Sequence, residues 1–274
     1  MTEFDRSAIR AFRFTGCQFD PATGEARLGY AFDDGPVMEE VVRFPGAPFA
    51  LDAARADAVQ RALRLLHLVA GVSYYKAAVP PQIVIEGEGI DAATAALLTS
   101  VYENGLGEFA YRNGLQLRGK IQFPVAGTVG GTSVPKPSGE ECSGLKSLLQ
   151  GAAPASGLAR HAVVAIGGGK DSLVSIEALR ALGIDQSVAW IGSSPLIRAC
   201  AARTGLPLLN ITRALSPRLF EINRLGALNG HIPVTAVNSA ILALAALLHG
   251  HDQVVFSNER SASYGSLIPG TGEV

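Results

Sequence analysis

The stretch that decides the fold runs Ala162-Val-Val-Ala-Ile-Gly-Gly-Gly-Lys-Asp-Ser-Leu-Val-Ser-Ile-Glu-Ala-Leu-Arg-Ala-Leu-Gly183. The apolar run at 162–166 predicts a strand, and the helical spacing of the later leucines and Ile176 predicts a helix over 172–182. The three glycines between them allow a close approach of the backbone, because glycine has no Cβ. A strand, a glycine loop and a helix N-terminus together present N–H groups to an anion. We therefore expect a phosphate-binding loop here.

The segment that follows this stretch alternates between strands and helices. Apolar patterns predict strands at 188–191, 207–211 and 253–256, and helices at 195–204, around 219–222 and at 233–249. Such alternation predicts a parallel sheet with right-handed crossovers. Ligands bind such sheets at the carboxyl ends of the strands, which is where the glycine loop lies.

The segment before this stretch is rich in alternating strands. Runs at 9–14, 26–32 and 37–44, separated by turn residues, predict an antiparallel meander. Two helices are expected behind the N-caps Asp52 and Asp91, with a short strand at 83–85 between them. Residues 126–157 are rich in Gly, Ser, Thr and Pro, which indicates a linker. We therefore expect an N-terminal α+β domain (1–125) and a nucleotide-binding domain (158–274) that is incomplete at its C-terminus.

The composition is that of a globular chain. Of the 274 residues 48% are hydrophobic and 17% are charged, and the net charge of −1 gives no basic surface for nucleic acid. Cys17, Cys142 and Cys200 are odd in number and widely spaced, which is typical of reduced thiols in a cytoplasmic protein. Neither a signal peptide nor a run long enough to span a membrane is visible. The oligomeric state is left open.

The spacing of the loop excludes the two commonest nucleotide motifs. Its glycines adjoin Lys170 without the spacer of a P-loop, and they do not form a Gly-x-Gly-x-x-Gly fingerprint. The run Gly168-Gly169-Lys170-Asp171-Ser172 instead resembles the Ser-Gly-Gly-x-Asp-Ser loop of the ATP-pyrophosphatase (PP-loop) family, with Gly167 in place of the leading Ser. A glycine turn before an amphipathic helix, without any phosphate, is the alternative.

This resemblance implies a parallel α/β sheet of the adenine-nucleotide alpha-hydrolase (HUP/PP-loop) type, which binds ATP and Mg²⁺ and releases AMP and pyrophosphate. Lys170 is then expected to neutralise the leaving group, and Asp171 to hold Mg²⁺ or to fix the loop. Ser172 is expected to cap the helix. The nucleotide-binding residues are expected to be Gly167, Gly168, Gly169, Lys170, Asp171, Ser172 and Ser193, unless Ser193 and Ser194 only cap the next helix.

Four further stretches are similar to the UDP-N-acetylmuramoyl-L-alanyl-L-glutamate epimerases of peptidoglycan synthesis. They are Phe12-Arg-Phe-Thr-Gly-Cys-Gln-Phe-Asp20, Gly71-Val-Ser-Tyr-Tyr-Lys76, Asn229-Gly-His-Ile-Pro-Val-Thr235 and Phe256-Ser-Asn-Glu-Arg-Ser-Ala-Ser263. The resemblance implies that ATP adenylates the terminal L-Glu of UDP-MurNAc-L-Ala-L-Glu with loss of pyrophosphate. The residue then loses and regains its α-proton, and hydrolysis releases AMP and leaves D-Glu at the end of the dipeptide.

Several polar residues are candidates for the remaining roles, each with a structural alternative. Tyr74, Tyr75 and Lys76 are expected to bind substrate, or to form a surface turn. His231 is a candidate acid or base, or makes only a structural hydrogen bond. Past the last strand, Asn258 and Arg260 are expected to bind substrate, and Glu259 to bind Mg²⁺ or act as a base; a local ion pair is the alternative.

Other functions stay open at this point. The loop also suits a PP-loop amidotransferase or ligase, a tRNA-modifying enzyme, or a sensor that binds ATP without cleaving it. The near-neutral charge disfavours a tRNA substrate. The cysteines are far apart, and clustered histidines are missing from the sequence, so a racemase cysteine pair and a zinc site are both disfavoured.

Overall fold

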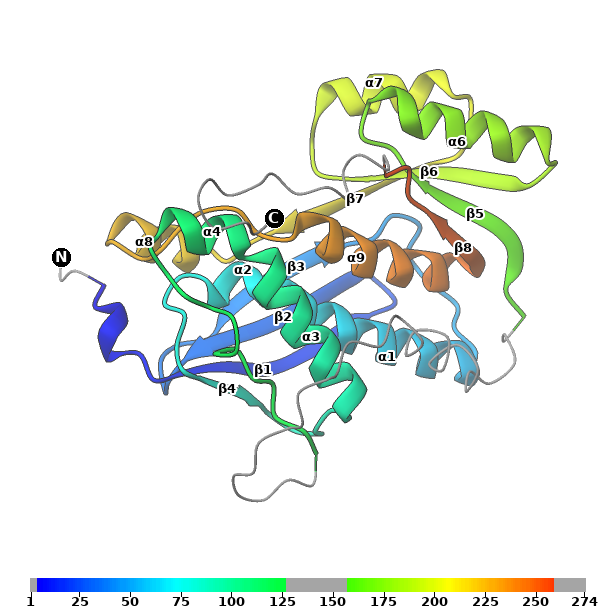
Figure 1. Ribbon diagram of the computed structural model, residues 1–274. Helices are drawn as coiled ribbons and strands as arrows, with labels where there is room; N and C mark the ends of the chain where they lie inside the picture. Colours follow the sequence, from blue (N-terminus) through cyan, green and yellow to red (C-terminus); the bar gives the residue numbers. More distant parts are fainter. Residues whose placement is uncertain (1–3, 127–156, 259–274) are drawn as a thin grey trace.

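The computed structural model describes residues 4–126 and 157–258, and its elements are shown in Figure 1. A 3-10 turn, Arg6–Ala8, precedes the first strand. The strands are β1 (Ala11–Asp20), β2 (Glu25–Phe32), β3 (Met38–Arg43), β4 (Gln82–Ile85), β5 (Ala159–Ala165), β6 (Asp185–Ile191), β7 (Leu208–Ala214) and β8 (His251–Val255). The helices are α1 (Ala53–Ala70), α2 (Val72–Tyr75), α3 (Ala92–Gly105), α4 (Gly107–Arg112), α6 (Lys170–Ala181), α7 (Pro195–Arg203), α8 (Pro217–Arg224) and α9 (Val234–His249).

The predicted meander is confirmed. β1 pairs with β2 and β2 with β3, in both cases antiparallel, and β4 adds to the outer side of β1 in parallel. Alternate residues of these strands point into the core, since Phe12, Phe14, Leu28 and Tyr30 are buried there. The two long helices begin where the sequence predicts, because Asp52 accepts a hydrogen bond from the backbone of Arg55 at 2.8 Å and Asp91 accepts one from Thr94 at 2.6 Å.

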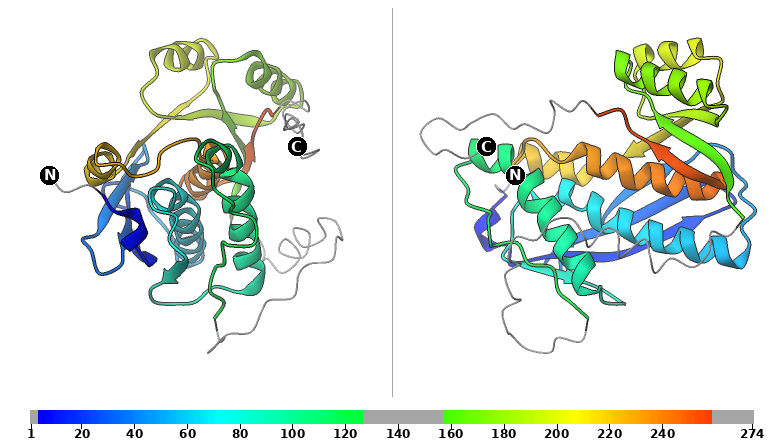
Figure 2. Two further views of the ribbon diagram at one scale, coloured as in Figure 1. Left: turned by 60° about the vertical axis from the view of Figure 1, so that its left-hand side comes forward. Right: turned by 45° about the vertical axis from the view of Figure 1, so that its right-hand side comes forward.

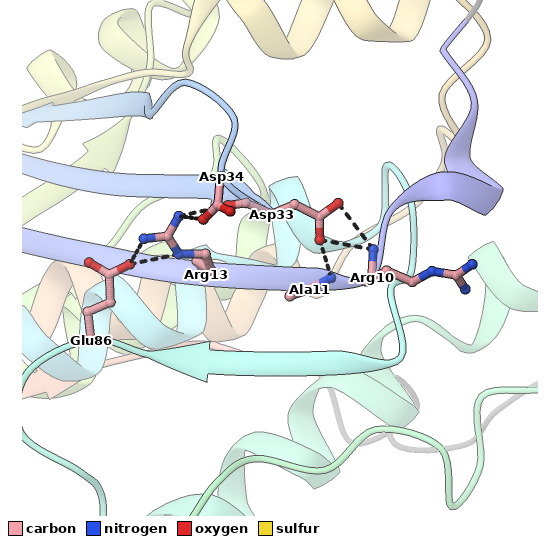
Figure 3. Close-up of polar contacts among 6 residues, drawn as sticks. All are labelled: Arg10, Ala11, Arg13, Asp33, Asp34 and Glu86. Atoms are coloured by element: carbon pink, nitrogen blue, oxygen red, sulfur yellow. Dashed lines mark hydrogen bonds and ion pairs between the residues drawn. The ribbon is translucent and has the colours of Figure 1, made fainter.

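The turn between β2 and β3 is fixed to the neighbouring strands by charged groups. Asp33 adopts a positive φ of 44°, and its carboxylate accepts hydrogen bonds from the backbone N–H groups of Arg10 and Ala11 (Figure 3). Arg13 donates to the Asp33 carbonyl and pairs with Glu86 beyond the end of β4, at 2.5 Å. Those contacts stabilise a backbone conformation that is uncommon for residues other than glycine.

The predicted parallel sheet is also confirmed. β7, β6, β5 and β8 lie side by side in that order, and every pair among them is parallel. The strand order reverses between β5 and β8, because the chain steps outward from β5 through β6 to β7 and then returns to the other side of β5. That reversal is the position where open parallel sheets bind their ligands. Assignment to the HUP/PP-loop type stays a prediction.

The two halves of the chain share one sheet of eight strands. β3 pairs with β7 in antiparallel register, with Val42 opposite Arg213, so the meander continues directly into the parallel strands. α6 and α7 cover one face of the parallel strands, and α9 and α1 lie on the other (Figures 1 and 2). Whether the predicted domains 1–125 and 158–274 fold separately stays a prediction. Most of the predicted linker lies outside the described residues.

A buried ion pair spans this junction. Glu40 on β3 has no exposed surface, and Arg213 on β7 donates to it from Nε at 2.7 Å and from Nη2 at 3.1 Å. Arg213 also donates to the Ser73 hydroxyl of α2 at 2.8 Å. These bonds tie three elements together where the meander meets the parallel strands. Within the described ranges, the helices are all too short or too polar to cross a membrane.

Candidate functional site

A cleft of about 330 Å³ opens at the carboxyl ends of β5, β6 and β8. The glycine loop and the start of α6 form one side of it, and the start of α7 forms another. The remaining sides come from α9 and from the residues after β8. The lining residues are Ala165, Ile166, Gly167, Gly169, Asp171, Ser172, Ala189, Trp190, Ile191, Ile197, Asn238, Leu242, Phe256, Ser257 and Asn258.

The glycine loop has the geometry that an anion site needs. Gly168 has a φ of +84°, which favours glycine, and the space beside Gly167 and Gly169 is open, since a Cβ added at either residue would meet no atom within 4 Å. α6 then begins at Lys170, and its N-cap Gly169 supplies no side-chain hydrogen bond. The first N–H groups of this helix, together with its dipole, therefore suit a phosphate group. The residues present fit the triphosphate of ATP.

Two expectations about the start of α6 are corrected. The helix begins at Lys170 rather than at Ser172, because Gly169 already has the extended conformation of an N-cap. Ser172 therefore lies inside the first turn and does not cap the helix; its buried hydroxyl donates to the Gly169 carbonyl at 3.1 Å. One turn later, the Ser175 and Ser257 hydroxyls lie 2.7 Å apart and join α6 to the segment after β8.

Apolar side chains form the wall of the cleft at β6 and α7. Trp190 is only 4% exposed, and Ile191 and Ile197 lie beside it in the lining. The indole N–H of Trp190 is buried without a hydrogen-bond partner in the described structure. A flat apolar surface next to a phosphate loop suits the base of a nucleotide.

The two serines before α7 differ in what they do. Ser194 is the N-cap of α7 and accepts a hydrogen bond from the backbone of Ile197, as the structural alternative expected. Ser193 is exposed and is not among the residues that line the cleft. Its contact with a nucleotide stays a prediction.

Tyr74, Tyr75 and Lys76 lie in and just after α2, away from the cleft lining, and all three are buried. The surface turn that was their structural alternative is therefore wrong. Tyr74 stacks on Tyr30 with ring centroids 4.4 Å apart, and its hydroxyl accepts from the Ser216 backbone at 3.0 Å. Burial raises the pKa of Tyr74 and of Tyr75, so the hydroxyls of these two residues stay protonated.

Lys76 is 6% exposed and donates to the Asn229 side-chain oxygen at 2.5 Å. Burial lowers the pKa of its ammonium group. This contact fixes the segment that leads from α8 to α9. A role in substrate binding stays a prediction for this lysine.

The remaining candidates fall at two other places. The side chain of His231, before α9, is 58% exposed and lies 3.8 Å from Glu108, outside the cleft lining. Asn258 lines the cleft as expected at the ligand end of the sheet. Glu259 and Arg260 lie outside the described residues.

The described ranges contain no group of three acidic, histidine or cysteine side chains that could hold a metal ion. Within the described ranges, Asp171 is the carboxylate that lines the cleft. Glu259, the second residue expected to hold Mg²⁺, lies outside the described residues. Cys17 lies on β1, where burial raises the pKa of its thiol, and Cys200 lies half-buried on α7. Cys142 lies outside the described residues.

Several residues of the cleft were not predicted from the sequence, among them Ser257, Asn238 and Leu242. Ser257 appears only as a neighbour of Asn258 in the sequence, and Asn238 and Leu242 lie on the long apolar helix α9. A signal for Asn238 was present, since an asparagine is unusual within such an apolar helix.

Comparisons with known proteins agree with the resemblance drawn from the sequence. A family model described as the MurL N-terminal domain matches residues 3–274. A protein of Xanthomonas oryzae pv. oryzae (strain MAFF 311018), named UDP-N-acetyl-alpha-D-muramoyl-L-alanyl-L-glutamate epimerase, is 66% identical over 274 residues, which are 100% of this chain and 56% of that protein. A protein of the same name from Salinispora tropica is 41% identical over 264 residues, which are 94% of this chain and 53% of that protein. The chain thus spans about half the length of the curated relatives it matches. No solved structure matches it significantly.

Proposed function

Because the chain belongs to the MurL N-terminal domain family, we propose that the protein is an ATP-dependent epimerase of the terminal L-Glu of UDP-MurNAc-L-Ala-L-Glu. The observation that carries this proposal is the cleft at the strand reversal, where a helix N-terminus without a side-chain cap, together with Gly167 and Gly169, faces an apolar wall. The names of the relatives support the substrate, and the cleft supports the use of a nucleotide.

The first step of the proposed reaction activates the substrate. A carboxylate oxygen of the terminal Glu attacks the α-phosphorus of ATP, and the bond to pyrophosphate breaks. The glycine loop and the first turn of α6 bind the departing phosphates, and Lys170 offsets the charge that develops on them. Asp171 and Glu259 are the residues proposed to hold Mg²⁺, which would supply further charge neutralisation.

The second step inverts the α-carbon. Because the carboxylate has become an acyl adenylate, the α-proton is acidic enough for a side-chain base to remove, and a second group returns a proton to the opposite face. The sequence predicts His231 for this exchange, although it lies outside the cleft lining, and Glu259, as the alternative to its role at Mg²⁺. Water then attacks the acyl carbon, which releases AMP and the D-Glu product.

Incubation of the full-length protein with ATP, Mg²⁺ and UDP-MurNAc-L-Ala-L-Glu in deuterium oxide tests this proposal. We expect AMP to form and deuterium to appear at the α-carbon of Glu. AMP without deuterium would replace the epimerase with an AMP-forming ligase. Nucleotide binding without AMP would replace it with an ATP sensor.

A further inference from the structure

α9 carries a half-buried amide side chain, that of Asn238, which lines the cleft and makes no hydrogen bond within the described ranges. The helix is apolar along most of its length, with Val237, Ile241 and Leu242 buried. The Ser239 hydroxyl is satisfied by the Thr235 carbonyl one turn earlier, at 2.8 Å. The Asn238 side chain, in contrast, makes no hydrogen bond to any residue of the described ranges 4–126 and 157–258.

An asparagine at this position lowers the stability of the helix. Asn is a poorer helix former than the alanines and leucines around it, because its amide competes for backbone groups. The amide also carries two donor hydrogens and an acceptor oxygen that need partners when they leave water. Because the Asn238 side chain is half-buried in the cleft lining and bonds to no described residue, its amide is available to a ligand that enters the cleft.

The position of Asn238 identifies the side of the cleft that it serves. Asn238 and Leu242 are one helical turn apart and both line the cleft. The glycine loop and α6 form the phosphate side, and Trp190 with its neighbours forms the apolar side. α9 packs on the face of the sheet opposite to α6. The remaining sides of the cleft are α9 and the segment after β8, so a second reactant that meets a nucleotide bound between the loop and the apolar wall contacts these two elements.

We propose that Asn238 binds the carboxylate of the acyl substrate by donating its side-chain N–H, and that it presents this carboxylate to the α-phosphorus of ATP. This assignment rests on the proposed function. A carboxylate is a pure acceptor and an amide N–H is a neutral donor, so the two are matched. A neutral donor also leaves the attacking oxygen more nucleophilic than a lysine or arginine would.

The same contact helps the step that follows. When a side-chain base removes the α-proton of the acyl adenylate, the C–H electron pair moves into the Cα–C bond. The π pair of the carbonyl then moves onto its oxygen. An N–H group already aimed at that oxygen stabilises the charge, because donors fixed in advance act most strongly where charge develops.

Two variants of Asn238 and one of its neighbour test the proposal in the full-length protein. Asn238→Asp keeps the shape of the side chain but replaces the donor with a like charge, and Asn238→Ala removes it. Ser239→Ala is the matched control, since its hydroxyl bonds only within α9. Circular dichroism checks the fold of each variant, and isothermal titration calorimetry measures the binding of ATP to the same full-length proteins.

For Asn238→Ala we expect kcat/KM for UDP-MurNAc-L-Ala-L-Glu to fall about 10- to 100-fold, the effect of one hydrogen bond to a charged group. Asn238→Asp should fall further, and Ser239→Ala should match the wild type. The Kd for ATP should stay within about 2-fold in Asn238→Ala.

Three results would overturn the assignment. Asn238→Asp with wild-type activity would show that no donor is needed. An equal loss of ATP binding in Asn238→Ala would place Asn238 with the nucleotide or with helix packing. If both Asn238 variants form AMP and exchange deuterium as fast as the wild type, the role of Asn238 is refuted while the proposed function stands. If the wild type itself forms no AMP, the proposed function is refuted as well.

Discussion

Replacement of Arg213 by Met tests whether the two halves of the sheet unfold together. Arg213 on β7 is the cation that faces the fully buried Glu40 on β3, with two hydrogen bonds of 2.7 and 3.1 Å between them. Methionine keeps much of the length and apolar volume of the arginine stem. The change therefore removes the charge and its donors, and it leaves a buried carboxyl without its partner.

The expected loss of stability is large. Removing one partner of a buried ion pair costs about 3–5 kcal/mol, because the remaining charge is no longer compensated. That is a large share of the roughly 5–15 kcal/mol by which a typical domain is stable. Burial already raises the pKa of the Glu40 carboxyl, so the folded state binds the carboxyl proton more tightly than the unfolded chain does. The free energy of unfolding therefore falls as the pH rises from the pKa of the unfolded chain through the pKa of the folded state. Loss of Arg213 enlarges the shift, so the variant should be weakest at neutral pH and recover in mild acid.

Urea unfolding, followed by circular dichroism and by Trp190 fluorescence, measures this loss. Trp190 lies on β6 and reports the parallel strands, while circular dichroism reports both halves. The control is Arg43→Met on β3, whose exposed ion pair with Glu25 at 2.6 Å should contribute only about 0–1 kcal/mol. Both probes should give one coincident transition for every variant, shifted strongly only for Arg213→Met.

The reasoning would be refuted by an Arg213→Met variant no less stable than Arg43→Met. Separate transitions for the two probes in the wild type would contradict the shared unfolding of the halves and would support the predicted division into two domains.

Three further substitutions have defined outcomes, two in the glycine loop and one in a histidine cluster. Lys170→Ala and Asp171→Ala should each reduce AMP formation at least about 100-fold without altering the fold, because both residues are proposed to act on the phosphates, whereas the exposed Lys120→Ala should not; wild-type rates in both would make the loop structural. At the start of β8, His251 stacks on His161 with ring centroids 3.8 Å apart. Burial lowers the pKa of His251 from 6.5 to about 4, and the nearby histidines add to the effect. The unfolded chain therefore takes up this proton first as the pH falls, so stability present above pH 6.5 should be lost between 6.5 and about 4. The difference in urea midpoint between about pH 7.5 and about pH 5 should shrink in His251→Phe, and an unchanged difference would exclude this histidine as the cause.

Most of the helices and strands were predicted, because residues within each element carry the pattern that identifies it. Alternation predicted the meander, N-cap residues predicted the start of α1 and α3, and the glycine loop predicted the ligand end of β5. The pairing of β3 with β7 was not predictable, because any strand with the alternation of 38–43 can pair with many partners, and here the partner is far along the chain. The error at Ser172 has a similar source, since glycine is also an acceptable N-cap and Gly169 took that position.

The site was predicted where the backbone itself carries the signal and missed where side chains converge from distant elements. The sequence suggested that Tyr74 and Tyr75 are polar groups that bind substrate or form a turn. In the structure the ring of each is buried in the core, and each hydroxyl is hydrogen-bonded to the backbone there. Asn238 is visible in the sequence as a polar residue within a largely apolar helix, but hydrophobic periodicity describes a buried face and does not show which position faces a cleft.

The central claim is that ATP activates the carboxylate of the substrate as an acyl adenylate, and transfer of labelled oxygen tests it most directly. UDP-MurNAc-L-Ala-L-Glu carrying oxygen-18 in the α-carboxylate of its Glu would be turned over by the full-length protein, and the released nucleotide analysed by mass spectrometry. The account predicts AMP that carries one labelled oxygen in its phosphate, because water cleaves the acyl carbon–oxygen bond. Unlabelled AMP, or ADP with labelled phosphate, would contradict it.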